Sequence, residues 1–407
     1  MFLMDIIQLI LFGICCYFVI ISFFSLAIIE KPKRGENLHT FALIIAAHNE
    51  EAVIAELVEC LKQQKYPDDK YKIFVVADNC DDRTAELARA AGAEVLERFD
   101  TVNRGKGFAM EYAFDKIFKM EENYQYFCVF DADNLVREDF LEKMNSKINQ
   151  GYRAVQGYLD SKNPTDTWLT FSYSLWYWIN NRLTQLSRCN LGLGCRLGGT
   201  GFAVEADLIR EFGWGATCLA EDIEFTLKLA LKDIKVGWAH DAVVYDEKPT
   251  HLGVSMKQRK RWAQGISDVS VRYVKPLLKK GIFERSGDAI HMLMNFWGDP
   301  LYLVSAGFMA LVFILSFFAN EGTLFYDLFI RMWAEPWRFL FLAVLVIANN
   351  ILVVASLYND NKLDKRIAKN IIGFILYVIT WIPIGIIGVL KRKDSEWFHT
   401  PHSGKKD

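Results

Sequence analysis

The stretch YFCVFDADN (126–134) decides the fold, because five apolar or aromatic residues lead directly into two aspartates. A short apolar run that ends in polar residues is typical of a buried strand. Similar runs precede it at 41–47, 71–77 and 93–98, and segments with helical spacing separate them at 51–64, 83–91 and 107–120. This alternation predicts an α/β domain with a parallel sheet and crossover helices.

Acidic residues stand where these predicted strands end. Asp78 follows the second run, and Asp131 and Asp133 follow the fourth. The carboxyl ends of parallel strands line the crevice in which open α/β sheets bind nucleotides. Two carboxylates spaced as Asp-x-Asp suit a hard divalent cation, so we expect Asp131 and Asp133 to hold Mg²⁺ or Mn²⁺ against a diphosphate. The alternative is a solvated loop after a buried strand.

Apolar segments flank the predicted domain. Residues 6–29 contain few polar breaks and are long enough to cross about 30 Å of hydrocarbon. The basic run at 31–34 follows at once, and the positive-inside rule places what comes after it in the cytoplasm. Further apolar stretches lie at 300–319, 338–358 and 371–390. We therefore expect a multi-pass protein of the plasma membrane with a cytoplasmic domain between its spans.

The basic run at 391–393 conflicts with this topology. Three spans after a cytoplasmic domain would leave it outside, against the positive-inside rule. Either one apolar stretch does not cross, with Pro383 as a candidate break, or the tail is a tolerated exception.

Composition and spacing also divide the chain and exclude some functions. A net charge of −2 argues against nucleic-acid binding. The eight cysteines show no metal-ligand spacing, so we expect reduced thiols. The predicted units are a transmembrane anchor (1–30), a catalytic domain (31–250), an amphipathic interfacial segment (251–290), C-terminal transmembrane helices (291–395) and a polar tail (396–407).

An ordered motif series runs through the domain. It comprises AAHNEE (46–51), VVADNCDD (75–82), RGKG (104–107), DADN (131–134), GTG (199–201), AED (220–222) and QRKRW (258–262). Over about residues 40–265 this series resembles the membrane-embedded family 2 glycosyltransferases, which include cellulose, hyaluronan and poly-N-acetylglucosamine synthases. The resemblance implies a GT-A (Rossmann-like) domain inserted between transmembrane helices. It also implies an inverting, metal-dependent enzyme that builds a β-linked polysaccharide from a UDP-sugar.

The resemblance further implies a donor site. Its nucleotide-sugar ligands would be Asn49, Glu50, Asp78, Lys106, Asp131 and Arg261, with the metal on Asp131 and Asp133. Asp78 would accept a hydrogen bond from the uracil imide, since a carboxylate is an acceptor only. This chain departs from the usual Asp-Asp-Gly-Ser of the family at 77–80, which affects the contacts beside Asp78. The alternatives are a helix cap for Asp78 and a plain glycine-rich turn around Lys106.

An acceptor site is implied as well. Asp222 would be the general base that removes the acceptor proton, and the alternative is an electrostatic complement to a helix N-terminus. Arg261 would clamp the pyrophosphate. The acceptor would lie against Glu221, Gln258 and Trp262, with the indole stacked on a sugar ring. The alternative for QRKRW is a basic helix that binds anionic lipid, which Lys257, Arg259 and Lys260 fit.

Several functions stay open at this point. The GTG loop favours UDP-glucose over UDP-N-acetylglucosamine as the donor. Transfer of one sugar to a lipid carrier is the alternative to a processive polymerase. A silent membrane scaffold or transporter subunit is the non-enzyme alternative, and the set of site carboxylates argues against it. The expected partners are the UDP-sugar, a growing glycan or glycolipid acceptor and membrane lipids, and a homo-oligomer is open.

Overall fold

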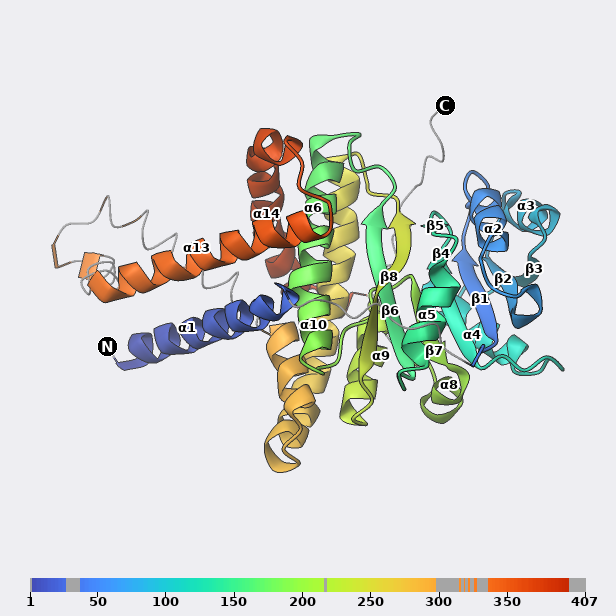
Figure 1. Cartoon of the computed structure of the whole chain (residues 1–407), viewed down its shortest axis with the longest axis horizontal. Coiled ribbons are helices and arrows are strands. Elements are labelled where there is room, and N and C mark those ends of the chain that lie inside the picture. The colour runs from blue at the N-terminus through green and yellow to red at the C-terminus, as the bar shows by residue number, and fades with distance from the viewer. Residues whose placement is uncertain are drawn as a thin grey trace.

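A computed structural model describes residues 2–26, 37–215, 218–297 and 336–394, together with isolated residues between 315 and 327. Its centre is an eight-stranded mixed sheet of order β3-β2-β1-β4-β7-β6-β8-β5 (Figure 1). The strands are β1 (Phe41–Ala47), β2 (Tyr71–Asp78), β3 (Glu94–Arg98), β4 (Tyr126–Asp131), β5 (Leu135–Val136), β6 (Ala154–Ser161), β7 (Phe202–Glu205) and β8 (Val236–Asp246).

The first four strands follow the predicted pattern. β1 pairs in parallel with β2 and β4, and β2 pairs in parallel with β3. The predicted bounds of β1 are confirmed, and those of the other three differ by one residue at one end. Asp78 and Asp131 are the last residues of β2 and β4. Because these strands are parallel, both carboxylates lie at one edge of the sheet.

The second half of the sheet is not parallel throughout, and the expectation of a parallel sheet was wrong there. β7 lies antiparallel between β4 and β6. The cause is the loop before it. Gly199 and Gly201 have φ values of 81° and 61°, and the amide of Gly201 donates to the carbonyl of Val129 on β4 (2.8 Å). The chain thus enters the sheet near the carboxyl end of β4 and has to run back along it.

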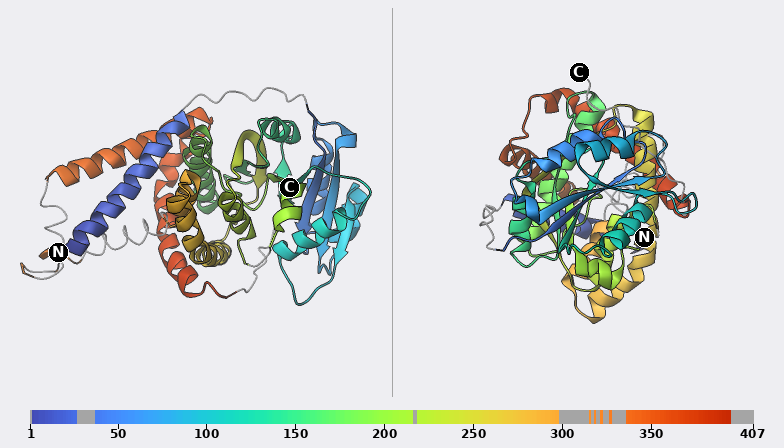
Figure 2. Two further views of the ribbon diagram at one scale, coloured as in Figure 1. Left: turned by 90° about the horizontal axis from the view of Figure 1, so that it is seen from below. Right: turned by 90° about the vertical axis from the view of Figure 1, so that its right-hand side faces the viewer.

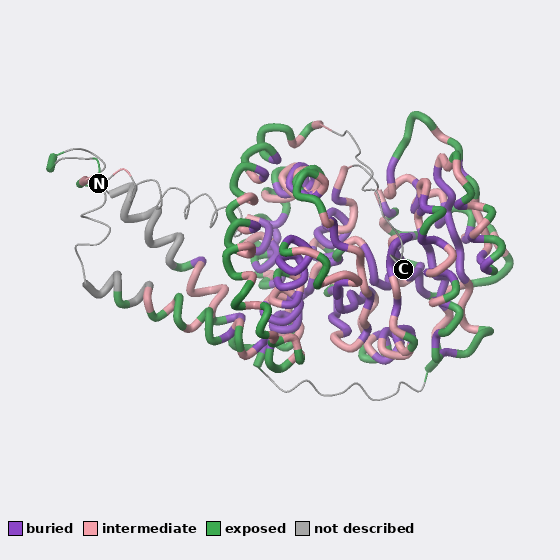
Figure 3. Tube along the Cα trace, turned by 90° about the horizontal axis from the view of Figure 1, so that it is seen from above, coloured by how far each residue is buried: buried purple, intermediate pink, exposed green. Residues whose placement is uncertain are grey.

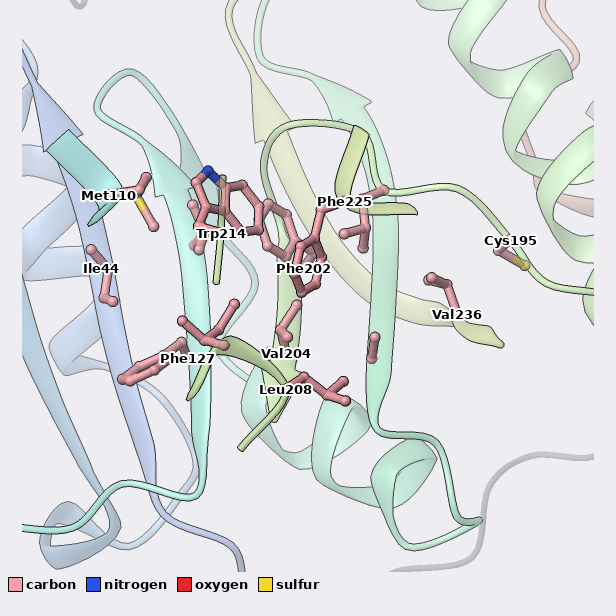
Figure 4. Packing of buried hydrophobic residues seen from close by; sticks show 14 of the residues in the cluster. Ile44, Met110, Phe127, Cys195, Phe202, Val204, Leu208, Trp214, Phe225 and Val236 are labelled. Carbon is pink, nitrogen blue, oxygen red and sulfur yellow. The ribbon is translucent and has the colours of Figure 1, made fainter. Parts of the chain in front are cut away.

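Two apolar layers enclose the sheet. Phe41, Leu43 and Ile45 of β1 pack in one cluster, and Ala42 and Ile44 pack in the other, as alternation along a strand requires. In the second cluster Figure 4 shows an aromatic group around Trp214. The helices that bear on the first cluster are α2 (Ile54–Lys62), α3 (Thr84–Ala91) and α5 (Phe140–Ile148), and those on the second include α4 (Lys106–Ile117), α8 (Ala206–Phe212) and α9 (Glu221–Leu231).

A layer of long helices stands beside this domain (Figures 1 and 2). It consists of α6 (Trp168–Asn180), α10 (Leu252–Phe283) and α14 (Arg366–Leu390). α1 (Phe2–Phe23) and α13 (Pro336–Asn359) extend away from this layer. Shorter elements are η1 (Phe24–Leu26), η2 (Asp68–Lys70), the π-helical η3 (Asn181–Leu186) and α7 (Ser187–Asn190).

The predicted apolar segments are helical where the structure describes them. Among the described residues one helix, Arg366–Leu390, is long and apolar enough to cross a membrane, and shorter apolar helices cover Gly13–Leu26 and Ala343–Asn359. The predicted span at 300–319 lies almost entirely outside the described residues, as does the tail at 396–407. Multi-pass insertion therefore stays a prediction. Figure 3 shows exposed residues on α13 and α14, whereas buried residues concentrate around the sheet.

Candidate active site

One cavity of about 1060 Å³ lies between the carboxyl edge of the sheet and the layer of long helices. Its lining includes side chains from both halves of the predicted site. These are Glu50, Asp78, Lys106, Asp131, Asp133, Glu221, Asp222, Gln258, Arg261 and Trp262. Residues separated by more than 200 positions in sequence are therefore brought to one space.

Asn49 is the predicted site residue that does not line this cavity. Its backbone has a positive φ of 55°, and its side-chain oxygen accepts from the amide of Asp81 (3.0 Å). Its own amide donates to the sulfur of Cys80 (3.4 Å). Asn49 thus joins the loop after β1 to the loop after β2. Its neighbour His48 does line the cavity, and the His48 ring is hydrogen-bonded to the carbonyl of Asp78 (2.7 Å).

Asp78 is fixed by an arginine that the sequence analysis did not select. Arg98 Nη1 lies 2.6 Å from Asp78 Oδ1, and both side chains are buried. Burial raises the pKa of Asp78, and the Arg98 guanidinium opposes that rise. Arg98 is the last residue of β3 and stands opposite Asp78 in the parallel ladder. The sequence did carry a signal for this ion pair, because the predicted strand at 93–98 ends in a cation, Arg98, beside the acidic edge of the sheet.

Lys106 reaches across the cavity edge from the start of α4. Its ammonium donates to the Asp131 carboxylate and to the carbonyl of Gly199 (2.6 Å). Burial alone would lower the pKa of Lys106, but the charges of Asp131 and Glu221 raise it above its usual value. Lys106 therefore contacts the Asp-x-Asp turn directly.

The GTG loop is bound to the DADN turn. The amide of Asp131 donates to Thr200 Oγ1 (3.1 Å) and to Asn134 Oδ1 (3.2 Å). The Thr200 hydroxyl also donates to Asn134 Oδ1, and both side chains are buried. These bonds hold the carboxylate turn in one orientation without using the carboxylates themselves.

The carboxylates of this turn fit a cation that is shared with a substrate. Asp131 and Asp133 both line the cavity and supply hard oxygen donors. Among the described residues no group of three or more His, Cys, Asp or Glu side chains gathers closely enough to enclose a metal. Mg²⁺ is commonly held by one or two carboxylates together with substrate phosphates and water. The donor set suits that arrangement and does not form an all-protein cage.

A third acidic strand end, Asp246, was not recognised in the sequence. Asp246 ends β8 and lines the cavity together with Glu247. Lys248 Nζ lies 2.6 Å from Asp246 Oδ2 and sits over the ring of Tyr177, 3.7 Å from its centroid. The Asp246 charge raises the pKa of Lys248 although burial opposes this. The rule that located Asp78 and Asp131, a carboxylate at the end of an apolar run, also applies to Asp246.

Glu221 and Asp222 occupy the first turn of α9. Burial raises the pKa of Asp222, while the amide of Ile223 and the charge of Lys106 oppose that rise. Burial and the neighbouring Asp222 raise the pKa of Glu221 to about 7. Asp222 therefore lies both at a helix N-terminus and in the cavity, so the two interpretations of this residue are compatible.

Gln258, Arg261 and Trp262 share one face of α10, because positions three and four apart are neighbours on a helix. The Tyr173 hydroxyl donates to Gln258 Oε1 (3.3 Å), and the Tyr173 ring meets the Trp262 ring edge-on at 6.5 Å. The Arg261 charge opposes the rise in the pKa of Glu221. The motif therefore points into the cavity.

Arg259 corrects the interpretation of the basic run. It is fully buried, and its Nη1 donates to Thr380 Oγ1 (2.9 Å) and the Tyr377 carbonyl (3.3 Å) of α14. It does not belong to a lipid-binding surface, because it joins α10 to α14. Lys257 is exposed, so binding of anionic lipid stays open for that residue.

Comparison with known proteins shows to which family the chain belongs. Residues 39–265, more than half of the chain, match the family described as glycosyltransferase like family 2. The chain belongs to this family. The matched region contains every site residue predicted above and agrees with the resemblance over residues 40–265. The protein is thus a glycosyltransferase.

Relatives within the glycosyltransferases differ in the products that their names state. The chain is 24% identical to a probable glycosyltransferase, YdaM, of Bacillus subtilis (strain 168), over 91% of this chain and 89% of that protein. It is 23% identical to a poly-β-1,6-N-acetyl-D-glucosamine synthase of Staphylococcus epidermidis (strain RP62A), over 90% and 87%. It is 27% identical to a β-monoglucosyldiacylglycerol synthase of Trichormus variabilis over 70% of this chain, and it spans about 61% of that relative.

A solved glycosyltransferase structure supports the fold. The mannosyltransferase PcManGT of Pyrobaculum calidifontis, solved with GDP-Man and Mn²⁺, matches 85% of this chain and 96% of its own, with a TM-score of 0.58 and 18% identity. The predicted GT-A-like α/β architecture is confirmed at this level.

Proposed function

We propose that this glycosyltransferase is an inverting, divalent-cation-assisted enzyme that transfers a sugar from a UDP-sugar to a hydroxyl group presented at a membrane surface. One observation carries the proposal. A single cavity contains the strand-end carboxylates Asp78, Asp131 and Asp133 on one side and Asp222 with the QxxRW face of α10 on the other. Donor-binding and proton-accepting groups therefore meet in one space.

The donor would lie along the sheet edge. Asp78, oriented by Arg98, accepts from the base, and Asn49 supports the loop behind it. Asp131 and Asp133 would hold Mg²⁺ or Mn²⁺, and the cation would supply charge stabilisation for the leaving diphosphate. Lys106 and Arg261 add positive charge from the two opposite walls, and Glu50 lines the same end of the cavity.

The transfer would be a direct displacement. Asp222 accepts the proton of the acceptor hydroxyl as the new bond forms between the acceptor oxygen and the anomeric carbon. The bond between that carbon and the β-phosphate oxygen breaks at the same time, and UDP leaves. An α-linked donor then gives a β-linked product. The raised pKa values of Glu221 and Asp222 suit proton transfer near neutral pH.

The residues that line the cavity suit two classes of acceptor, a sugar and a lipid. Trp262 and Gln258 suit a sugar acceptor, which supports synthesis of a β-linked polysaccharide, with UDP-glucose as the favoured donor and UDP-N-acetylglucosamine as the alternative. A specific observation favours a lipid acceptor as the second candidate. The cavity continues along α14, where it is lined by Trp381, Ile382, Ile386, Val389 and Leu390.

Location at the plasma membrane, with the catalytic domain in the cytoplasm, belongs to the same proposal. It rests on the apolar α1, α13 and α14 and on the basic run at 31–34.

One assay separates these candidates. Membranes that contain the purified protein would be incubated with a panel of labelled UDP-sugars with Mg²⁺ or Mn²⁺, and products would be sized and digested with linkage-specific hydrolases. A polymer extending from a glycan supports the polysaccharide synthase, and one sugar on an extractable lipid supports the second candidate. A retained α-linkage would contradict inversion. An absence of turnover with every donor, both as transfer and as donor hydrolysis, would favour the silent scaffold.

A further inference from the structure

α14 meets the length and composition of a membrane span, yet its middle and its carboxyl end lie against one helix of the catalytic domain. In the middle, Arg259 of α10 donates to Thr380 and to the Tyr377 carbonyl. Towards the carboxyl end, Gln264 of α10 donates to the Lys391 carbonyl (3.0 Å). α14 therefore runs alongside α10 from Tyr377 to Lys391.

Close packing reinforces this arrangement at two glycines. A Cβ atom added at Gly388 would lie 2.6 Å from the Cβ of Ala263 on α10. A Cβ atom added at Gly373 would lie 3.1 Å from the Trp168 ring at the start of α6. α14 thus contacts the domain near both of its ends and not through one end alone.

The connector before α14 is also fixed to the domain. Asp360 is bonded to Arg182 of η3 and lies 3.1 Å from His240 Nε2 of β8. Lys362 Nζ lies 2.6 Å from Asp160 Oδ2 of β6. The residues that lead into α14 therefore contact the sheet region, and Lys391, which follows α14, contacts α10 of the same domain.

The outer face of α14 is apolar and exposed along its length. Ile372, Ile379 and Ile386, each two helical turns from the next, are 70%, 51% and 54% exposed, and Ile386 stands where this face borders the cavity described above. Basic residues stand at both ends of the helix: Lys365, Arg366 and Lys369 before this face, and Lys391, Arg392 and Lys393 after it. Figures 1 and 2 show α14 standing across the direction in which α1 and α13 leave the domain.

We infer that α14 lies along the membrane surface, with its apolar face immersed in the leaflet next to the catalytic domain, and does not cross the bilayer. The inner face of α14 is covered by α10 and α6, so only its outer apolar face is left for the acyl chains, as in a helix that lies in the interface with one face immersed. The basic groups at both ends then reach anionic headgroups of a single leaflet. The run at 391–393 stays on the same side as the run at 31–34, which removes the conflict with the positive-inside rule. This inference concerns topology and does not depend on the donor or acceptor.

The first test locates the carboxyl end of the chain, which carries no substitution. An epitope tag after residue 407 would be probed by protease in inside-out vesicles and in intact spheroplasts, with an antibody to the catalytic domain as the internal control. We expect the tag and the domain to be digested in the same preparation. Digestion of the tag in one preparation and of the domain in the other would show that α14 crosses, and would overturn the inference.

The second test measures depth along the helix. A fluorescent amino acid would be placed by codon suppression at Ile372, Ile379 or Ile386, in vesicles whose lipids carry bromine at defined acyl positions. We expect the same lipid to quench all three positions best. A crossing helix would separate the outer two positions by about 21 Å at 1.5 Å per residue and place Ile379 deepest. That pattern overturns the inference, and so does the absence of quenching at all three, which would mean that protein covers the face.

Discussion

The two walls of the cavity are held in place by different forces. The wall formed by the sheet is organised by charge, through Asp78 with Arg98 and Lys106 with Asp131. The wall formed by α10 and α14 is organised by aromatic and aliphatic packing around the guanidinium of Arg259, which lies 4.5 Å from the centroid of Tyr377. The difference matches the two proposed substrates, because a nucleotide diphosphate needs fixed charges whereas an acceptor at a membrane needs apolar contact. If the two walls act independently, a change in one wall should leave the function of the other intact.

On the sheet wall, Asp133→Asn should abolish turnover. The change removes a charged ligand of the proposed cation, whose charge stabilisation in the transition state is worth several kcal/mol. Turnover would be measured at increasing Mg²⁺ and Mn²⁺, and in the wild type with a chelator. Asp115→Asn, an exposed position on α4, is the matched control and should leave activity unchanged. Undiminished wild-type turnover in excess EDTA would show that no cation is required.

At the junction of the walls, Asp222→Asn should lower kcat by about 10²-fold or more and leave UDP-sugar binding nearly intact, as expected when a general base is removed. Calorimetry with the donor and a rate assay would be made on the same preparation. Asp207→Asn is a control of the same type, because Asp207 is an exposed carboxylate in the first turn of α8. Equal losses in affinity and rate would instead identify Asp222 as a binding residue.

On the helix wall, Trp262→Ala should weaken acceptor binding by about 1–3 kcal/mol, with base–aromatic stacking as the nearest guide. UDP binding should survive, since the donor carboxylates lie on the other wall. Chain extension should fail or give short products, while donor hydrolysis persists, and Trp262→Phe should restore part of the activity. Product sizing is the measurement. A wild-type product with one added sugar would reject processive synthesis outright.

Arg259→Ala should destabilise the helix wall alone. A hydrogen bond to a charged group contributes about 1.5–3 kcal/mol to stability, so the free energy of unfolding should fall by at least about that amount. Thermal unfolding in detergent would report the loss, and UDP binding by the remaining folded protein should stay close to wild type. A loss of UDP affinity without a loss of stability would mean that the two walls are not separable.

Glu221 should make the stability of the protein depend on pH. Its folded pKa of about 7 lies above the ordinary value near 4.3, so between these pH values the folded state holds more protons than the unfolded state. Stability should therefore fall as pH rises through that window. Glu221→Gln should flatten the fall in Tm between pH 5 and pH 8. An equally steep fall in the variant would assign the dependence to another group.

Much of the sheet wall was predictable because its determinants are local. Apolar runs that end in aspartate located Asp78, Asp131 and Asp133, and the spacing of QxxRW placed Gln258 and Trp262 on one helix face. The same local reasoning was not extended to Asp246, which also ends a strand.

The remaining features depend on contacts between distant segments. β7 is only four residues long, which is too short for periodicity to show its direction. Arg98 becomes the partner of Asp78 through the register of β2 and β3. Arg259 resembles its basic neighbours in sequence, and only the docking of α14, more than 100 residues later, shows that it is buried.

Lys106 gives Asp131 a counter-ion tethered to the chain itself. A metal ion that arrives alone has to compete with this ammonium, whereas a metal already carried by a nucleotide offers the ammonium phosphate oxygens in exchange. We therefore expect the cation and the nucleotide to arrive as one species, with Mn²⁺ binding much more weakly in the absence of UDP than in its presence. Lys106 would then set the order of binding, because the cation would enter the site only together with the nucleotide.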